Sequence, residues 1–184
     1  GGYKIDLRLY VLVISLGLPN DIGQTGAEDE LQAYIFSEGL VRFASEPYRL
    51  DSHTAGNPFI HLTNNEVNAR NASKPGLGLT RSGNWGLGRL WQWLSAQNSG
   101  DSTHGENAKT IIWQRICDLA YDVLLCAKPT LRQALAGLPD QAKESCFELF
   151  GFDVVIDDSW QPWLCEVNSL PALGVGGNVD LAVD

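Results

Sequence analysis

The chain has 184 residues, 44% of them hydrophobic, with 6 tryptophans and a formal net charge of −9. This length and apolar content are those of a globular domain with a real core, which excludes a disordered chain. The negative charge argues against broad contact with nucleic acid or acidic membranes, and no apolar run is long enough to cross a bilayer.

The cysteines are widely spaced in apolar surroundings, without a Cys-x-x-Cys pair. We therefore expect small buried hydrophobes in a reducing compartment, and neither a disulfide framework nor a zinc site. They are Cys117, Cys126, Cys146 and Cys165. The chain opens at Gly1-Gly2 without an initiating methionine, from which we expect a piece of a longer protein.

Residues 3–16 alternate between polar and apolar side chains before becoming continuously apolar, which predicts a strand entering a covered sheet. The polar face carries Lys4, Asp6, Arg8 and Tyr10. A salt-bridged surface ladder is one interpretation of this face. A surface that handles phosphates or carboxylates is the other, because the arginine fork suits both groups.

Residues 17–30 are rich in turn formers and predict a loop insertion. Residues 32–36 and 40–44 then predict a hairpin through Ser37-Glu38-Gly39. Arg42 interrupts the second of these strands. Its side chain either faces solvent or points into the same polar site as Arg8.

Residues 59–71 begin as an extended segment and become polar abruptly. Thr63 and Asn64 either cap a short helix or bind a ligand, with capping the default. His61 is interpreted as a structural histidine. Residues 72–83 predict an irregular loop whose glycine spacing matches neither phosphate-binding fingerprint.

Helices follow in the middle of the chain. Residues 84–97 carry apolar side chains at helical spacing, and residues 108–128 predict a second helix stopped by Pro129. Residues 130–138 predict a short third helix. Strands at both ends and helices between them indicate an α+β fold.

The closing segment predicts a hairpin of residues 152–156 and 163–167. If residues 158–161 form its loop, Asp153 lies opposite Glu166, and Asp157 lies opposite Pro162. Glu166 shares its strand face with Asn168. Facing carboxylates repel, so the pair requires a cation, a shared proton or a different register; Mg²⁺ fits an all-oxygen set. An ordinary solvated face is the alternative.

Four ordered blocks that together span nearly the whole chain resemble the tubulin–tyrosine ligase-like family of ATP-grasp ligases. They are Tyr3-Lys-Ile-Asp-Leu-Arg-Leu-Tyr-Val-Leu-Val13, Gly39-Leu-Val-Arg-Phe-Ala-Ser-Glu-Pro-Tyr48, His61-Leu-Thr-Asn64, and Phe147-Glu-Leu-Phe-Gly-Phe-Asp153 followed by Trp163-Leu-Cys-Glu-Val-Asn168. The resemblance implies an ATP-grasp-like α+β fold, with residues 1–184 forming its C-terminal portion. We expect the N-terminal part of the nucleotide cleft to precede Gly1, and the chain alone to turn over little.

The resemblance also implies roles, position by position. Asp153, Glu166 and Asn168 match Mg²⁺ ligands, and Arg8 and Arg42 match catalytic arginines that hold the incoming amino acid and the reacting carboxylate. Nucleotide contacts are implied for Lys4, Asp6, Thr63 and Asn64.

The implied reaction is an ATP-dependent ligation through an acyl-phosphate, most like the polyglutamylases, which join glutamate to the acidic tails of tubulin. Neither nucleic acid nor membrane is an expected partner, and the expected location is the cytoplasmic microtubule cytoskeleton, including a cilium or basal body. Asn84 stands where polyglutamylase-like sequences often carry lysine, which leaves glycine or tyrosine open as the amino acid. A noncatalytic microtubule-binding relative and an ATP-grasp ligase for a small molecule are the remaining alternatives.

Overall fold

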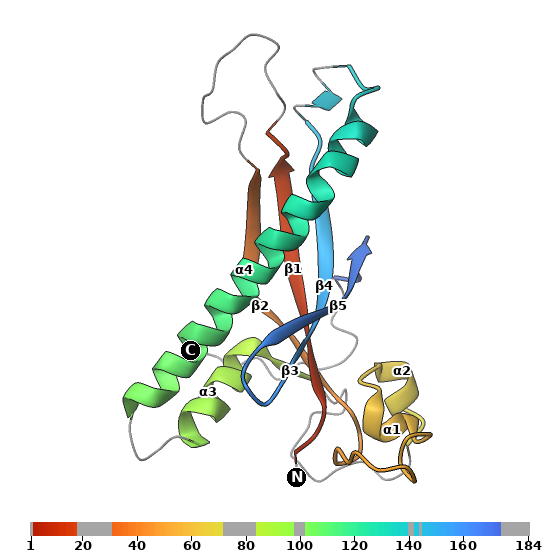
Figure 1. The fold of residues 1–184 in the computed structure, drawn as a ribbon, viewed down its shortest axis with the longest axis vertical. Helices are drawn as coiled ribbons and strands as arrows, with labels where there is room; N and C mark the ends of the chain where they lie inside the picture. The colour runs from red at the N-terminus through yellow and green to blue at the C-terminus, as the bar shows by residue number, and fades with distance from the viewer. Residues whose placement is uncertain are drawn as a thin grey trace.

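The computed structural model describes residues 2–17, 31–71, 84–97, 102–139, 142–143 and 145–173. The predicted loop at 17–30 beyond its first residue, the predicted loop at 72–83 and the segment after residue 173 lie outside these ranges. Within them two strands come first, helices and one short strand follow in the middle, and two strands come last, with all strands in one sheet (Figure 1).

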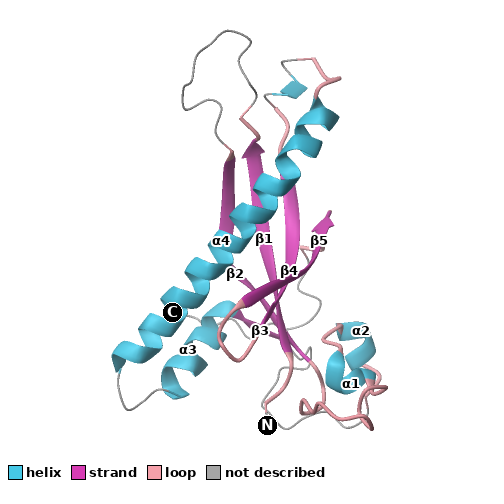
Figure 2. Ribbon diagram, in the orientation of Figure 1, coloured by secondary structure: helices cyan, strands magenta, loops and turns pink. Residues whose placement is uncertain are grey.

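The sheet has 5 strands in the order β3-β2-β1-β4-β5, and every neighbouring pair is antiparallel. Figure 2 shows α3 (Leu87–Gln97) and α4 (Ser102–Leu135) on one face of this sheet and α1 (Pro58–His61) and α2 (Asn65–Asn68) together at one end, a segregation that confirms the α+β prediction. The strands are β1 (Ile5–Ser15), β2 (Gln32–Phe43), β3 (Asn84–Gly86), β4 (Glu148–Ile156) and β5 (Pro162–Ser169).

β1 forms the centre of the sheet, as its alternating sequence predicts. Leu7, Leu9 and Val11 are at most 1% exposed, and they share one face because side chains alternate along a strand. Burying three large aliphatic side chains stabilises the fold by roughly 1.5–3 kcal/mol each. The opposite face carries Asp6 and Arg8.

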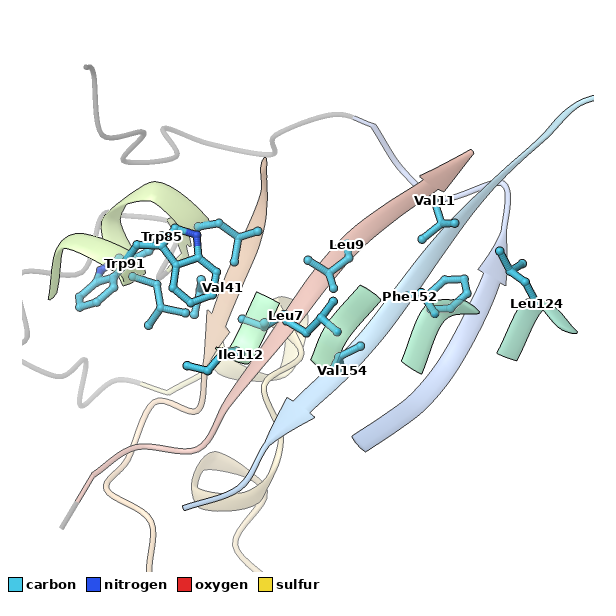
Figure 3. Close-up of a cluster of buried hydrophobic side chains, with 14 of the residues drawn as sticks. Leu7, Leu9, Val11, Val41, Trp85, Trp91, Ile112, Leu124, Phe152 and Val154 are labelled. Carbon is cyan, nitrogen blue, oxygen red and sulfur yellow. The ribbon is translucent and has the colours of Figure 1, made fainter. Parts of the chain in front are cut away.

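Two helices cover the apolar face. They are α3 (Leu87–Gln97) and α4 (Ser102–Leu135), and α4 crosses the sheet diagonally in Figure 1. Figure 3 shows the resulting core, in which Phe152, Val154 and Val41 from the sheet meet Ile112 and Leu124 of α4.

α4 corrects the predicted helix ends. The helix is a single element of 34 residues that runs through Pro129, so the predicted stop there and the separate helix at 130–138 are both wrong. Proline removes one helical N–H and crowds the carbonyl four residues earlier. Here Pro129 and Leu125 are both exposed, so solvent can satisfy the carbonyl that loses its partner.

Three other predicted elements also differ. β2 is one strand that pairs along β1, and not a hairpin. The register shifts between the pairings of Leu9 and Val11, where residues 36–38 form a bulge in β2. Asn84–Gly86 form β3 instead of the first turn of a helix. The predicted extended start at residue 59 is the short helix α1 (Pro58–His61), which Asn57 caps and Pro58 begins.

The cysteines are free thiols, as predicted, but the expectation that they are buried is wrong. Cys126 and Cys165 are exposed, and the other two are half-buried. Cys165 lies on β5, the last strand at one edge of the sheet. Among the described helices, none has the length and apolar content needed to cross a membrane.

Candidate ligase site

The polar face of β1 gathers side chains from three strands, as the alternation predicts. Asp6 lies opposite Arg42 of β2, and Arg8 lies opposite Asp153 of β4. Because directly paired residues place their side chains on the same face, these four groups share one surface. The pairing alternates acid with base across the sheet.

Arg42 and Asp6 form a bidentate ion pair. Nε and Nη2 of Arg42 donate to the two carboxylate oxygens of Asp6 at 2.6 and 2.7 Å. Asp6 is 7% exposed, so its charge is largely removed from water. A parallel two-bond geometry of this kind gives arginine both strength and a fixed orientation.

Arg8 and Asp153 repeat the arrangement on the other side of β1. Nε and Nη2 of Arg8 donate to Asp153 at 2.5 and 3.0 Å. Nη2 of Arg42 lies 2.9 Å from Oδ2 of Asp153, which joins the two pairs into one network. Arg42 therefore does not face solvent; it points into the same site as Arg8.

The contacts in the network shift the pKa values of Asp153 and Arg42. Burial of Asp153 opposes its charge, but the hydrogen bonds from Arg8 and Arg42 outweigh this cost and hold the pKa of the carboxyl below its ordinary value. Burial likewise lowers the pKa of Arg42, and the hydrogen bond and charge of Asp6 outweigh it and raise the pKa instead. Asp153 and Arg42 thus stay ionised at neutral pH.

The segment that contains α1 and α2 (Asn65–Asn68) closes one end of the network. The Thr63 hydroxyl donates to Oδ2 of Asp6 at 2.7 Å, and the Lys4 ammonium donates to the His61 carbonyl at 2.8 Å. The His61 ring lies 3.0 Å from the Thr54 carbonyl oxygen, in keeping with a structural histidine.

Asn64 takes the default role expected of it. Its side-chain oxygen accepts the backbone N–H groups of Glu66 and Val67 at 2.8 and 3.2 Å, which caps α2. This cap satisfies two donors that the helix cannot satisfy internally. A nucleotide contact of Asn64 therefore stays a prediction.

The β4–β5 hairpin has the predicted pairing at its centre but not at its turn. Asp153 lies opposite Glu166, whereas Pro162 pairs with Ile156 and not with Asp157. Asp157 belongs to the turn because its carboxylate accepts the backbone N–H groups of Ser159 and Gln161, both at 2.9 Å. A register shift that passes over Cys165 then restores the pairing of Asp153 with Glu166.

The facing carboxylates avoid repulsion in a way that the sequence analysis did not consider. Asp153 is neutralised by arginines from β1 and β2, while Glu166 is exposed to solvent. In the described part of the chain, no hydrogen bond or ion pair holds the Glu166 carboxylate. The amide of Asn168 donates to the Gly151 carbonyl at 3.5 Å, which is a long contact.

The donor chemistry fits Mg²⁺. Asp153 accepts three arginine N–H groups, and a carboxylate offers about four lone-pair directions, so one remains for a cation. Glu166 and the amide oxygen of Asn168 supply the further oxygen ligands that Mg²⁺ prefers. In the described residues, no group of three or more His, Cys, Asp or Glu side chains is clustered as a metal site.

Asn84, predicted at the start of a helix and at the position where polyglutamylase-like sequences often carry lysine, lies instead in β3 at the edge of the site. It lies opposite Arg42 in the β2–β3 ladder and is 4% exposed. The Asn84 amide is therefore a buried polar group at the edge of the site, next to the ion pair of Arg42 and Asp6. The only hint in the sequence that this residue belongs to a site is a polar side chain between a glycine-rich segment and Trp85. Strand β3 is too short for the alternation of a strand to be recognised.

Comparison with known proteins gives one family and a consistent set of relatives. The profile of the Tubulin-tyrosine ligase family matches residues 1–183. Human "Tubulin monoglutamylase TTLL4" is 35% identical over 99% of this chain, which covers 14% of that protein. Human "Probable tubulin polyglutamylase TTLL2" is 34% identical over 100% of the chain, and Caenorhabditis elegans "Tubulin polyglutamylase ttll-4" is 31% identical over 98%; the chain covers 26% of each.

Proposed function

The chain belongs to the tubulin-tyrosine ligase family, whose profile matches it over residues 1–183, and from this premise we propose that the protein is an ATP-dependent protein–amino acid ligase. The ATP-grasp-like α+β fold of that family agrees with the five-stranded antiparallel sheet. The relatives are several times longer than this chain, so their whole activity is carried over here as a proposal.

One observation carries the proposal. Side chains from separate motif blocks form a continuous ionic network on one sheet face, through Thr63, Asp6, Arg42, Asp153 and Arg8. A surface ladder made only for solubility would not require burial of Asp6 and Asp153, each 7% exposed. Buried charges that are held in place by bidentate pairs are typical of sites that orient anionic groups.

The proposed reaction has two steps. An oxygen of the acceptor carboxylate attacks the γ-phosphorus of ATP, and ADP leaves. The amine of the incoming amino acid then attacks the acyl carbon, loses a proton, and expels inorganic phosphate as the amide bond forms. Mg²⁺, when bound, supplies charge neutralisation at the transferred phosphoryl group.

The chain's own residues act by orientation and charge. Arg8 and Arg42 hold the carboxylates of the amino acid and the acceptor, and Asp6 and Asp153 fix both guanidinium groups. Asp153, Glu166 and Asn168 would hold the metal, and Lys4, Asp6, Thr63 and Asn64 would lie beside the nucleotide. No side-chain nucleophile is required, because catalysis rests on positioning and electrostatics.

Glutamate is the proposed amino acid and tubulin the proposed acceptor. The support is that the relatives carry the names of tubulin monoglutamylases and polyglutamylases. The proposed location is accordingly the microtubule cytoskeleton, including cilia and basal bodies. The net charge of −9 supports the exclusion of nucleic acid and acidic membranes as partners.

The test is a ligation assay with the natural full-length protein. It is incubated with ATP, Mg²⁺ and tubulin, and with labelled glutamate, glycine or tyrosine in separate reactions. We expect glutamate label in tubulin, with one ADP and one phosphate released for each residue added. Incorporation of glycine or tyrosine alone would correct the substrate, and no incorporation of any of the three would contradict the proposal.

A further inference from the structure

The chain reverses direction directly after β5 and passes back over β4. Leu170 follows the last residue of β5 with a φ of 65°, and its side chain is 91% exposed. A left-handed backbone costs a leucine roughly 1–2 kcal/mol, and an exposed side chain recovers none of this by burial. Contacts made by the residues that follow must therefore hold the turn.

Gly151 of β4 provides the first of those contacts. A β-carbon added at Gly151 would lie 2.7 Å from the β-carbon of Pro171. Real β-carbon contacts essentially never come so close. Only glycine at position 151 therefore leaves room for Pro171 and the turn. Gly151 precedes Asp153 by two positions, which places it on the same sheet face as the ionic network.

Tyr10 provides the second contact. Its hydroxyl donates to the carbonyl oxygen of Ala172 at 3.0 Å. Tyr10 lies opposite Gly151 in the β1–β4 ladder and two positions beyond Arg8, on the same strand face. The turn is thus fixed from β1 and β4 together.

The side chain of Arg8 also lies close to Gly151. The added β-carbon would lie 3.3 Å from Cδ and 3.5 Å from Nε of Arg8. This Nε is the atom that donates to Oδ1 of Asp153. A methyl group at Gly151 would therefore press on Pro171 and on the part of Arg8 that sets its guanidinium plane.

We propose that Gly151, Pro171 and Tyr10 are positioning residues that hold the Arg8 guanidinium in place through the turn after β5. Asp153 holds one edge of the guanidinium through two hydrogen bonds, and the missing side chain of Gly151 leaves room for both Pro171 and the arginine stem. An arginine stem that is already ordered loses less entropy when it binds a carboxylate. The inference rests on the proposed function in one respect, namely that Arg8 binds a substrate carboxylate.

The test compares Gly151→Ala, Pro171→Gly and Tyr10→Phe in the natural full-length protein. Gly137→Ala is the matched control, because a β-carbon there meets nothing within 4 Å. We expect the KM for the amino acid to rise on the order of tenfold in the three variants, because a displaced arginine loses its alignment. The control should match the wild type.

A second readout does not depend on activity. In protein labelled with ¹⁵N-arginine, the Arg8 Nε–H signal is assigned by its loss in Arg8→Lys. It should shift and exchange faster with water in Gly151→Ala, and stay unchanged in Gly137→Ala. An unchanged Arg8 signal in folded Gly151→Ala would overturn the inference.

If Gly151→Ala does not fold, the other two variants decide, because they only remove atoms. An Arg8 signal that is unchanged in both Pro171→Gly and Tyr10→Phe overturns the inference. If the signal moves but the wild type ligates no amino acid, the positioning of Arg8 stands and the proposed function fails.

Discussion

Arg42 and Asp153 lie on strands at opposite sides of β1, yet Nη2 of Arg42 is 2.9 Å from Oδ2 of Asp153. The same guanidinium also holds Asp6 through two bonds. One side chain therefore links two carboxylates across three strands. Nη2 alone contacts both carboxylates, and Nε adds a second bond to Asp6 in a planar geometry that an ammonium, with all its donors on one nitrogen, cannot reproduce.

Arg42→Lys should weaken the network. A lysine ammonium can contact both carboxylates through its single nitrogen, but it lacks the second nitrogen donor that makes the pair with Asp6 bidentate. We expect a loss of about 1–3 kcal/mol in the free energy of unfolding, because a buried charged group then lacks a hydrogen bond. Urea denaturation measures the loss, and ligation should fall by more than 10²-fold if Arg42 also binds substrate.

Arg49→Lys is the matched control for Arg42→Lys, because Arg49 is exposed outside the network. It should change the unfolding free energy by less than about 0.5 kcal/mol. Equal losses in the two variants would mean that the Arg42 fork has no special role.

The stability of the fold should depend on Asp153 at acid pH. The folded-state pKa of this carboxyl lies below the ordinary value of 3.8, so the unfolded chain binds the proton more tightly. Its stabilisation is fully present above the unfolded pKa and is lost as the pH falls through the folded pKa. The free energy of unfolding should therefore drop below about pH 4 in the wild type.

Asp153→Asn isolates this contribution. The variant should be less stable at pH 7 and should lose less further stability on acidification. Asp122→Asn, which replaces an exposed carboxylate of α4, should follow the wild-type curve. A wild-type curve and an Asp153→Asn curve of identical slope between pH 5 and pH 3 would refute the assignment.

Thr63→Val tests the attachment of the α1–α2 segment. The substitution keeps the shape of the side chain but removes the hydroxyl that donates to Asp6 at 2.7 Å. We expect a loss of about 1.5–3 kcal/mol, since one buried hydrogen bond to a charged acceptor disappears. Thr54→Val, which removes a hydroxyl in an exposed turn, should cost clearly less; equal costs would argue against the Asp6 contact.

Much of the site could be predicted from periodicity, and the hairpin shows the limit of such prediction. The expected opposition of Asp153 and Glu166 is confirmed, but the loop that led to it is wrong. Two deviations cancel: Asp157 joins the turn, and a bulge at Cys165 shifts the register back. Bulges depend on twist and on edge position, which no local residue pattern reveals.

The arginine contacts could not be predicted for a similar reason. The alternation in β1 places Arg8 and Asp6 on one face, but their partners come from strands more than 30 residues away in sequence. Pro129 shows the opposite error, since a strong local signal for a helix end is overridden by packing of α4 on the sheet. Tertiary contacts decide both cases.

Glu166→Gln tests whether the site binds Mg²⁺ for ligation. The substitution removes one charge from an exposed residue at the proposed metal site and leaves the buried network in place. The natural full-length wild type, Glu166→Gln and Glu148→Gln, an exposed carboxylate at the far end of β4, are compared for ATP-driven incorporation of labelled glutamate into tubulin over a range of Mg²⁺ concentrations. We expect Glu166→Gln to unfold at the same urea concentration as the wild type. It should require more Mg²⁺ and incorporate on the order of 10²-fold less label, because a metal ligand is lost. Incorporation by Glu166→Gln at the wild-type rate and the wild-type Mg²⁺ dependence would contradict this expectation.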